Sequence, residues 1–142
     1  MKSNLGMVVM TYHFSTTVKL SFDAALAATQ AALKAHGFGV LTEIDVQATM
    51  KAKLGIEFRP YRILGACNPQ MAYRALQAED KIGTMLPCNV IVQEKVDGRV
   101  EVSAVDPVAS MQAVDNQTLG EVAQTVRQKL REVIDAVSTA AG

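Results

Sequence analysis

Apolar and polar positions change their spacing several times along the first half of the chain. Residues 7–14 are rich in Val, Met, Tyr and Phe, a composition typical of a strand. From Ser21, a favourable helix N-cap, apolar side chains recur at helical spacing until Gly37. Residues 40–45 then alternate, with Glu43 and Asp45 on one face. The pattern therefore predicts a strand, an amphipathic helix and a second strand with two different faces.

The middle of the chain predicts a short helix, a third strand and another helix. Asp45 is placed to cap a helix that runs to Leu54, and Gly55 is suited to end it. Residues 61–67 form an apolar run of strand length. The dipeptide Asn68-Pro69 has the residue types of an N-cap and a first helical position. The third strand is therefore expected to lead directly into a helix N-terminus.

Residues 87–106 have the pattern of a β-hairpin. Residues 87–95 and 99–106 are largely apolar runs on either side of Asp97-Gly98, and Asp-Gly between such runs predicts an antiparallel hairpin. A two-residue turn there places Asn89 opposite Asp106. The same turn also places two glutamates opposite each other, which is mildly destabilising, so the register is left open.

The last part of the chain predicts a long helix. Thr118 and Glu121 have the spacing of a capping box. A single apolar stripe then runs along one helical face. Its members are Leu119, Val122, Val126, Leu130, Val133 and Val137.

This order of elements predicts an α+β fold, because helices are mixed with an antiparallel strand pair. We expect a five-stranded, mainly antiparallel sheet with helices packed on one face and the long C-terminal helix among them. No linker or repeat divides the chain, so residues 8–140 are predicted to form a single domain after a flexible tail at residues 1–7.

Composition narrows the classes of partner. The 142 residues are 49% hydrophobic and 20% charged, which fits a chain that folds around a core. The formal net charge is zero, so we expect no nucleic-acid partner. No apolar stretch is long enough to span a membrane, and residues 1–10 lack the apolar region of a secretory signal. These features predict a cytoplasmic protein with no membrane partner.

Cys67 is the first candidate for chemistry. It immediately precedes the predicted helix start at Asn68, where free N–H groups and the helix dipole favour negative charge. A thiolate or a bound anion would be stabilised there. The alternative is structural: Asn68 only caps the helix, and Cys67 is a buried packing residue, as free cysteines commonly are.

Cys88 is followed by Asn89, as Cys67 is followed by Asn68, and it lies at the start of another predicted strand. If the two strands are neighbours, Cys67 and Cys88 come together as a redox pair or a soft-metal site. A zinc site needs about four ligands, and only His13 and His36 would remain to complete it. We therefore expect no metal and no cofactor.

Glu43 and Asp45 are the candidate acidic pair. Their i, i+2 spacing on one strand face puts them about 7 Å apart, a distance at which two carboxylates can act on one substrate. The structural alternative assigns Asp45 to the cap of the following helix and Glu43 to an ion pair with an arginine such as Arg62.

Three blocks of sequence carry a family resemblance. They are residues 37–46 (GFGVLTEIDV), residues 58–69 (FRPYRILGACNP) and residues 86–90 (LPCNV). In this order they resemble the domain of unknown function 302 family, and the resemblance extends over about residues 8 to 139. The motif residues that match are Glu43, Asp45, Arg59, Tyr61, Cys67, Asn68, Cys88, Asn89 and Asp106.

The resemblance implies a compact α+β fold of the TATA-binding-protein-like type and a homodimer. It implies neither DNA binding nor a catalytic role for any motif residue, because fold and function separate readily. Whether the chain is an enzyme stays open at this point.

From residues and resemblance together we expect a homodimeric module that binds a small, anionic ligand near Asn68. Arg59 or Arg62 would neutralise the ligand, Asn68 and Asn89 would orient it, and Cys67 would line the wall. Two alternatives use the same residues. One is a thiol-dependent redox enzyme or sensor with Cys67 as nucleophile and Cys88 as resolving thiol, and the other is a protein-interaction module without a ligand. The full set of expected ligand-binding residues is Glu43, Asp45, Arg59, Tyr61, Arg62, Cys67, Asn68, Asn89 and Asp106.

Overall fold

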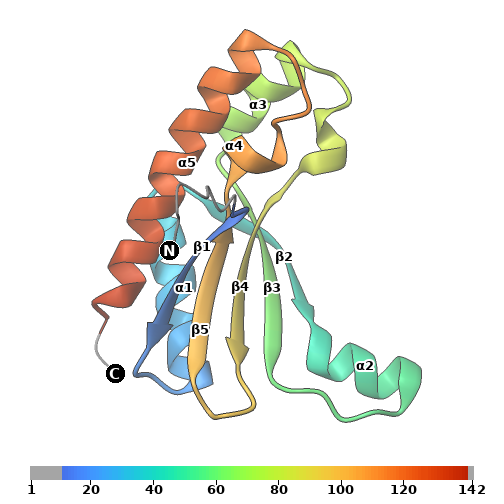
Figure 1. The fold of residues 1–142 in the computed structure, drawn as a ribbon, viewed down its shortest axis with the longest axis vertical. Helices are drawn as coiled ribbons and strands as arrows, with labels where there is room; N and C mark the ends of the chain where they lie inside the picture. Colours follow the sequence, from blue (N-terminus) through green and yellow to red (C-terminus); the bar gives the residue numbers. More distant parts are fainter. Residues whose placement is uncertain (1–10, 141–142) are drawn as a thin grey trace, which may run out of the picture.

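A single five-stranded antiparallel sheet organises the chain (Figure 1). The structure is a computed structural model that describes residues 11–140. The strand order is β1-β5-β4-β3-β2, and every neighbouring pair is antiparallel. The strands are β1 (His13–Val18), β2 (Gly39–Asp45), β3 (Tyr61–Cys67), β4 (Cys88–Glu94) and β5 (Val100–Val105). The predicted α+β class and the five-stranded sheet are confirmed.

Strand β1 runs later in the chain than the expected residues 7–14. It pairs with β5 from His13 opposite Val105 to Val18 opposite Val100. The polar run Ser15-Thr16-Thr17 lies within it, because an edge strand needs apolar residues only on its covered face. Residues 7–10 of the expected strand, and the predicted tail at residues 1–7, lie outside the described residues.

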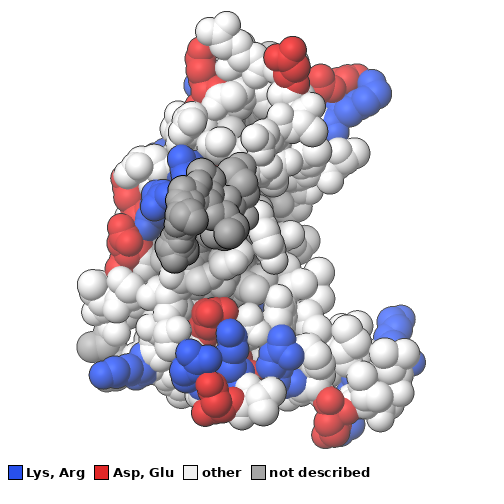
Figure 2. All heavy atoms as spheres, in the orientation of Figure 1, with Lys and Arg blue, Asp and Glu red and all other residues white. Residues whose placement is uncertain are grey.

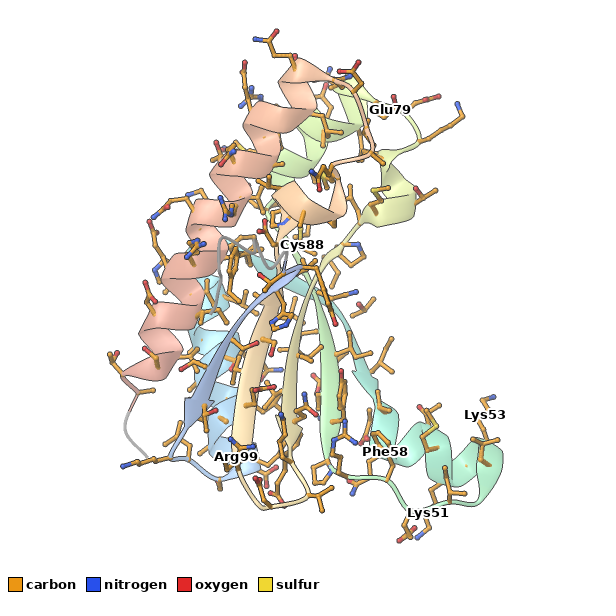
Figure 3. The ribbon with its side chains drawn as sticks, viewed as in Figure 1. Lys51, Lys53, Phe58, Glu79, Cys88 and Arg99 are labelled. Atoms are coloured by element: carbon orange, nitrogen blue, oxygen red, sulfur yellow. The ribbon has the colours of Figure 1, made fainter. Side chains whose placement is uncertain are left out.

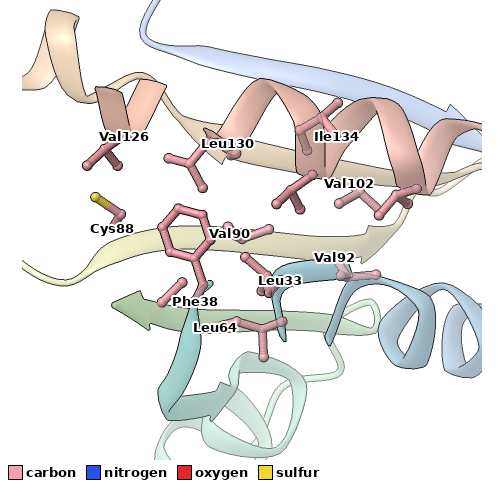
Figure 4. Close-up of a cluster of buried hydrophobic side chains, with 14 of the residues drawn as sticks. Leu33, Phe38, Leu64, Cys88, Val90, Val92, Val102, Val126, Leu130 and Ile134 are labelled. Carbon is pink, nitrogen blue, oxygen red and sulfur yellow. The ribbon is translucent and has the colours of Figure 1, made fainter. Parts of the chain in front are cut away.

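Two helices cover one face of the sheet, as the apolar stripes predicted. They are α1 (Phe22–Ala35), capped by Ser21, and α5 (Gln117–Ser138). All six residues of the predicted stripe on α5 are buried. Figure 4 shows Leu130 of α5 and Leu33 of α1 beside Val90 and Val102 of the sheet, all within the buried core.

The N-cap of α5 differs from the predicted capping box. Asn116, not Thr118, is the cap: its side-chain oxygen accepts a hydrogen bond from the backbone N–H of Leu119 at 3.0 Å. Asn116 also donates from Nδ2 to the carbonyl oxygen of Ala78 at 2.8 Å. Asn116 is the more favourable N-cap residue type, and its second bond joins the start of α5 to the end of α3 (Pro69–Ala78).

The hairpin between β4 and β5 is confirmed, but its loop is longer than the Asp97-Gly98 turn. Lys95 and Arg99 still pair, with Lys95 N donating to Arg99 O at 2.7 Å, so three residues form the loop. Gly98 N donates to Lys95 O at 2.8 Å, and Gly98 has φ of +88°. A three-residue loop that ends in a left-handed glycine is a common hairpin connection. The register therefore shifts by one, and Glu94 faces Val100 rather than another glutamate.

Strand β2 and the following helix form an arm at one edge of the sheet (Figure 1). Helix α2 (Val46–Leu54) is capped by Asp45 and ends at Gly55 as predicted, yet none of its residues is buried. The pairing of β2 with β3 shifts between Val40 and Thr42. This bulge at Leu41 breaks the simple alternation expected from the sequence.

Three short elements close the end of the sheet opposite to the β4–β5 hairpin. Helix α3 begins at the predicted Asn68-Pro69 signal. The 3-10 helix η1 (Ile82–Met85) and the helix α4 (Pro107–Ser110) were not predicted, because neither is long enough to show a helical period. Asp106 caps α4, with Oδ1 accepting from Val108 N at 3.0 Å. These elements surround the candidate site.

Among residues 11–140, no helix combines the length and the apolar character that a membrane span requires.

Candidate functional site

A cavity of about 310 Å³ lies where the ends of β3 and β4 meet α3, α4 and α5. Helix α3 contributes Met71, Ala72, Ala75 and Leu76, and α5 contributes Val122, Ala123 and Val126. The strand ends and loops contribute Phe38, Leu41, Ala66, Cys67, Asn68, Leu86, Pro87 and Cys88, while Pro107 and Met111 come from α4 and the residue after it. The cavity is thus assembled from segments far apart in the sequence.

The wall of the cavity is apolar. Among the described residues that line it none is charged, and Asn68 is the one side chain with an amide. Leu41 and Leu76 are 66% and 44% exposed, which places them at the rim. Ala75 and Ala123, at 2% and 3%, lie inside. Such a wall offers burial of apolar surface and few hydrogen bonds.

Asn68 performs its predicted capping role. Its side-chain oxygen accepts a hydrogen bond from Met71 N at 3.2 Å, at the first turn of α3. Its amide nitrogen faces the turn before β2, where a Cβ added to Gly37 would lie 3.4 Å from Nδ2. Because one end of the side chain serves the cap, the NH₂ group is the part that a ligand could use.

The two thiols lie on neighbouring strand ends beside the cavity. Cys88 pairs across the sheet with Ala66, the residue before Cys67. Cys88 is 8% exposed, and its side chain points toward Val126 of α5 (Figure 4). Burial, with a smaller effect from Cys67, raises the pKa of the Cys88 thiol from an ordinary 9.0 to about 11. Cys67 is half-buried. Strands β3 and β4 are neighbours as expected, but Cys67 is offset by one residue from the partner of Cys88, so the two side chains leave the sheet on opposite faces.

The acidic pair and its arginine lie at the other end of β3. Arg62 forms ion pairs with Glu43 through Nη1 and with Asp45 through Nη2, the second at 3.3 Å. Asp45 also caps α2, with Oδ1 accepting from Ala48 N at 2.9 Å, and Glu43 accepts from Gln30 Nε2 at 3.2 Å. Structural partners therefore occupy both carboxylates, as the alternative interpretation predicted.

Arg59 and Tyr61 form a second group near the same end. The Arg59 guanidinium lies 5.5 Å from the Tyr61 ring centre and 4.5 Å from that of Phe58. Its Nε donates to Gln93 Oε1 at 3.0 Å. Neither Arg59 nor Arg62 lines the cavity at Asn68.

Asp106 and Asn89 also lie outside the cavity lining. Asp106 is 6% exposed, and its Oδ2 lies 3.4 Å from Arg127 Nε, an ion pair without a well-aligned hydrogen bond. Asn89 is exposed and faces Gly65 across the β3–β4 pair. It lines a separate depression together with Pro87 and Val105.

The structure thus brings together only part of the predicted site. Cys67, Asn68 and Cys88 share one cavity, whereas the remaining predicted residues lie elsewhere. Sequence reasoning missed the apolar lining, above all Phe38, Met71 and Met111. Apolar lining residues follow the same spacing as core residues, so no local signal distinguishes them.

Charged side chains are distributed away from this cavity. Figure 2 shows both signs mixed near the β4–β5 hairpin and along α5, with much of the remaining surface uncharged. In Figure 3, Lys51 and Lys53 lie on the α2 arm, far from Cys88. These two lysines therefore do not surround the cavity.

Comparison with known proteins gives a family and a fold. Residues 14–137 match the family model described as "Domain of unknown function DUF302". A crystal structure of an uncharacterized conserved DUF302 protein from Bacillus stearothermophilus is 27% identical and superposes with a TM-score of 0.84. The match covers 90% of this chain and 99% of that one. No curated protein matches the chain.

Proposed function

Because the chain belongs to the DUF302 family, whose description assigns no activity, we propose a function from the cavity itself: it binds a small, predominantly apolar molecule. The observation that carries this proposal is a cavity of about 310 Å³ whose described lining contains no charged residue. That volume is at the lower end of the roughly 300–1,000 Å³ of small-molecule sites, which are mostly apolar with few polar groups.

The chemistry of the wall favours a neutral ligand over the expected anion. Burying an ionised group in a protein without a partner of opposite charge costs on the order of several kcal/mol. Arg59 and Arg62, the cations expected to compensate such a charge, lie at the opposite end of β3 and have their own partners. The part of the ligand that enters is therefore apolar, and one polar atom can meet the Asn68 amide.

The proposed functional unit is a homodimer, as the family resemblance implies. Apolar side chains that are exposed in the single chain gather on β2, α2 and the turn after it. A second copy against this edge would cover them and pair the free edge of β2. Leu41 belongs both to this surface and to the cavity rim, so the dimer would restrict access to the cavity. The exposed residues are Val40, Leu41, Ile44, Leu54 and Ile56.

The thiol-dependent alternative is weakened by Cys88. A thiol whose pKa is raised to about 11 is protonated near neutral pH and is a poor nucleophile. Both cysteines line the cavity, and this keeps the alternative, with half-buried Cys67 as its attacking group.

A matched pair of fluorescent probes tests the proposal. N-phenylnaphthylamine is neutral, and anilinonaphthalene sulfonate is the same ring system with a sulfonate added. We expect the neutral probe to bind the full chain with a blue-shifted emission and the anionic probe to bind at least about tenfold more weakly. Tighter binding of the anionic probe would instead support the anionic ligand.

Two alanine substitutions locate the binding. Ala72→Leu places extra carbons in the cavity and is expected to weaken neutral-probe binding by about tenfold or more. Ala52→Leu, on the exposed arm α2, is the matched control and leaves the affinity unchanged. No binding of the neutral probe, or equal effects of the two substitutions, would contradict the proposal and favour an interaction module without a ligand.

A further inference from the structure

Exposed apolar side chains gather on two separate surfaces of the chain. Among residues 11–140, ten large apolar residues are exposed, and eight of them belong to these surfaces. The arm surface is made by β2, α2 and the turn after it, and it carries Val40, Leu41, Ile44, Leu54 and Ile56. The cavity-end surface is made by α3 and η1, and it carries Tyr73, Leu76 and Met85. Single exposed apolar residues are ordinary, but two groups of this kind indicate an interface.

The arm receives little support from its own chain. No residue of α2 is buried, and β2 is exposed from Gly39 to Ile44. A helix of nine residues is marginal in water by itself, because isolated helices shorter than about 12–15 residues are not stable. Strand β2 is also at the edge of the sheet, where its outer N–H and C=O groups have no strand partner among the residues described. Packing by another molecule would stabilise both elements.

A two-fold axis beside β2 brings the two surfaces together. When an edge strand pairs antiparallel with the same strand of a second copy, the start of each strand lies beside the end of the other. Strand β2 begins at Gly39, which pairs with Cys67 at the cavity, and it ends at Asp45, where α2 follows. Helix α2 of each copy would therefore lie beside the cavity-end surface of the other.

Shape and charge fit this arrangement. In Figure 2 the outline of the molecule recedes between the cavity end and α2, so a second arm has room there. Lys51 on α2 and Asp80 after α3 have ion-pair partners in their own chain. Within the described part of the chain, this leaves Lys53 and Glu79 without an ion pair near these two places, which lie far apart in Figure 3. The two-fold axis places these opposite charges on facing surfaces.

We propose that two copies of the chain pair antiparallel through β2, so that α2 of each copy covers the cavity mouth of the other. This rests on the proposed apolar ligand site and adds to it, because the second copy completes the rim formed by Leu41 and Leu76. Leu54 and Ile56 of the covering arm supply the additional apolar wall. Ala52 lies about 200° around the helix from Leu54, so it stays outside this contact.

The arrangement links ligand binding to dimer formation. A cavity that the second copy closes holds an apolar molecule more tightly, since more of the surface of that molecule is removed from water. Coupling between two binding events is reciprocal, so the ligand strengthens the dimer by the same factor.

The oligomeric state of the full chain tests the pairing, and we expect sedimentation equilibrium to show a dimer. Ile56→Asp on the arm and Tyr73→Asp on α3 are each expected to weaken the dimer by at least about a hundredfold, because each buries an unpaired charge. Neither residue lines the cavity, and both are exposed in the single chain. The variants should therefore fold, which circular dichroism and urea unfolding check. Val96→Asp, in the β4–β5 loop at 98% exposure, is the matched control and stays dimeric.

The two aspartate variants distinguish this dimer from other pairings. Tyr73 is distant from β2 in the chain and belongs only to the cavity-end surface, so a dimer through β2 alone would not respond to Tyr73→Asp. Parent-like affinity of either aspartate variant would overturn the proposal. A monomeric parent chain would also overturn it and would point to a different protein as the partner of the arm.

The neutral probe tests whether the second copy completes the site. At a chain concentration where the parent is dimeric and Ile56→Asp is monomeric, the variant is expected to bind N-phenylnaphthylamine at least about fivefold more weakly. Equal affinity would overturn the role of the second copy in the site while leaving the ligand proposal intact. No binding of the probe by the parent would contradict the ligand proposal and that role together, and sedimentation would still decide the pairing.

Discussion

Cys88 pairs with Ala66 across β3 and β4, so Cys67, the next residue of β3, points to the opposite face of the sheet although both cysteines line one apolar cavity. Cys88 is 8% exposed and lies beneath Val126, whereas Cys67 is half-buried at the point where β3 leads into α3. This difference separates a packing thiol from an accessible one and gives two predictions.

The first prediction concerns alkylation. In the native state near neutral pH, iodoacetamide is expected to modify Cys67 much faster than Cys88, because Cys88 is buried and protonated. Mass spectrometry of the Cys67→Ser and Cys88→Ser variants over time measures each rate alone. In denaturant the two rates should become equal. Equal rates in the native state would show that Cys88 is not protected.

The second prediction concerns alkaline stability. The pKa of Cys88 is raised in the folded chain, so the unfolded chain loses this proton at lower pH. The stabilising contribution is complete below about pH 9 and is lost as pH rises through about 11, amounting to roughly 2–3 kcal/mol. Urea unfolding across this range should show a steeper loss for the parent than for Cys88→Ala. A parallel pH dependence of the two proteins would contradict the assignment.

The third prediction concerns the close packing beside the cavity. A Cβ added at Gly65 would collide with Thr42 Oγ1 and lie 2.7 Å from Pro87 Cγ. Gly65→Ala is therefore expected to destabilise the fold by about 1–3 kcal/mol, the usual cost of overpacking. Gly120→Ala is the control: it lies in α5 with nothing within 4 Å, and alanine there should stabilise the helix by about 0.5–1 kcal/mol. Unfolding in urea measures the free energy of unfolding of both variants. An unchanged value for Gly65→Ala would contradict the close packing of Gly65 against Thr42 and Pro87.

The fourth prediction concerns the acidic pair. Glu43 is partly exposed and pairs with Arg62, so Glu43→Gln should change stability by less than about 1 kcal/mol and leave neutral-probe binding unchanged. Asp45→Ala removes a helix cap as well as an ion pair and should cost more, about 0.5–2 kcal/mol. Loss of probe binding in Glu43→Gln would contradict this and would show that Glu43 contributes to the ligand site.

Local signals predicted most of the fold. The caps at Ser21, Asp45 and Asn68 and the stop at Gly55 are where the sequence placed them, because short-range hydrogen bonds and backbone preferences determine them. The prediction failed at the start of α5, where the capping-box spacing pointed to Thr118 but Asn116 is the cap and also bonds to the Ala78 carbonyl. It also failed in the hairpin loop, where Gly98 alone supplies the left-handed residue.

The candidate site was less predictable than the fold. Cys67, Asn68 and Cys88 were identified because they lie at strand and helix ends, which the sequence predicts. No sequence pattern distinguishes Met71 and Met111, since they reach the cavity only through the packing of α3 and α4 around the strand ends. Glu43, Asp45 and Arg62 were grouped correctly as neighbours, but their mutual ion pairs use them structurally.

The measurement that tests the central claim most directly is a methyl NMR spectrum of the chain labelled at its methionines, recorded with and without N-phenylnaphthylamine. Met71 and Met111 line the cavity, whereas Met50 lies on α2 and Met85 lies in η1 outside the cavity lining. We predict saturable shifts of the Met71 and Met111 methyl signals, while the Met50 and Met85 signals stay in place. The variants Met71→Leu and Met111→Leu assign the signals, because each removes one of them. Shifts confined to Met50 or Met85, or no shift at saturating probe, would contradict binding in the cavity.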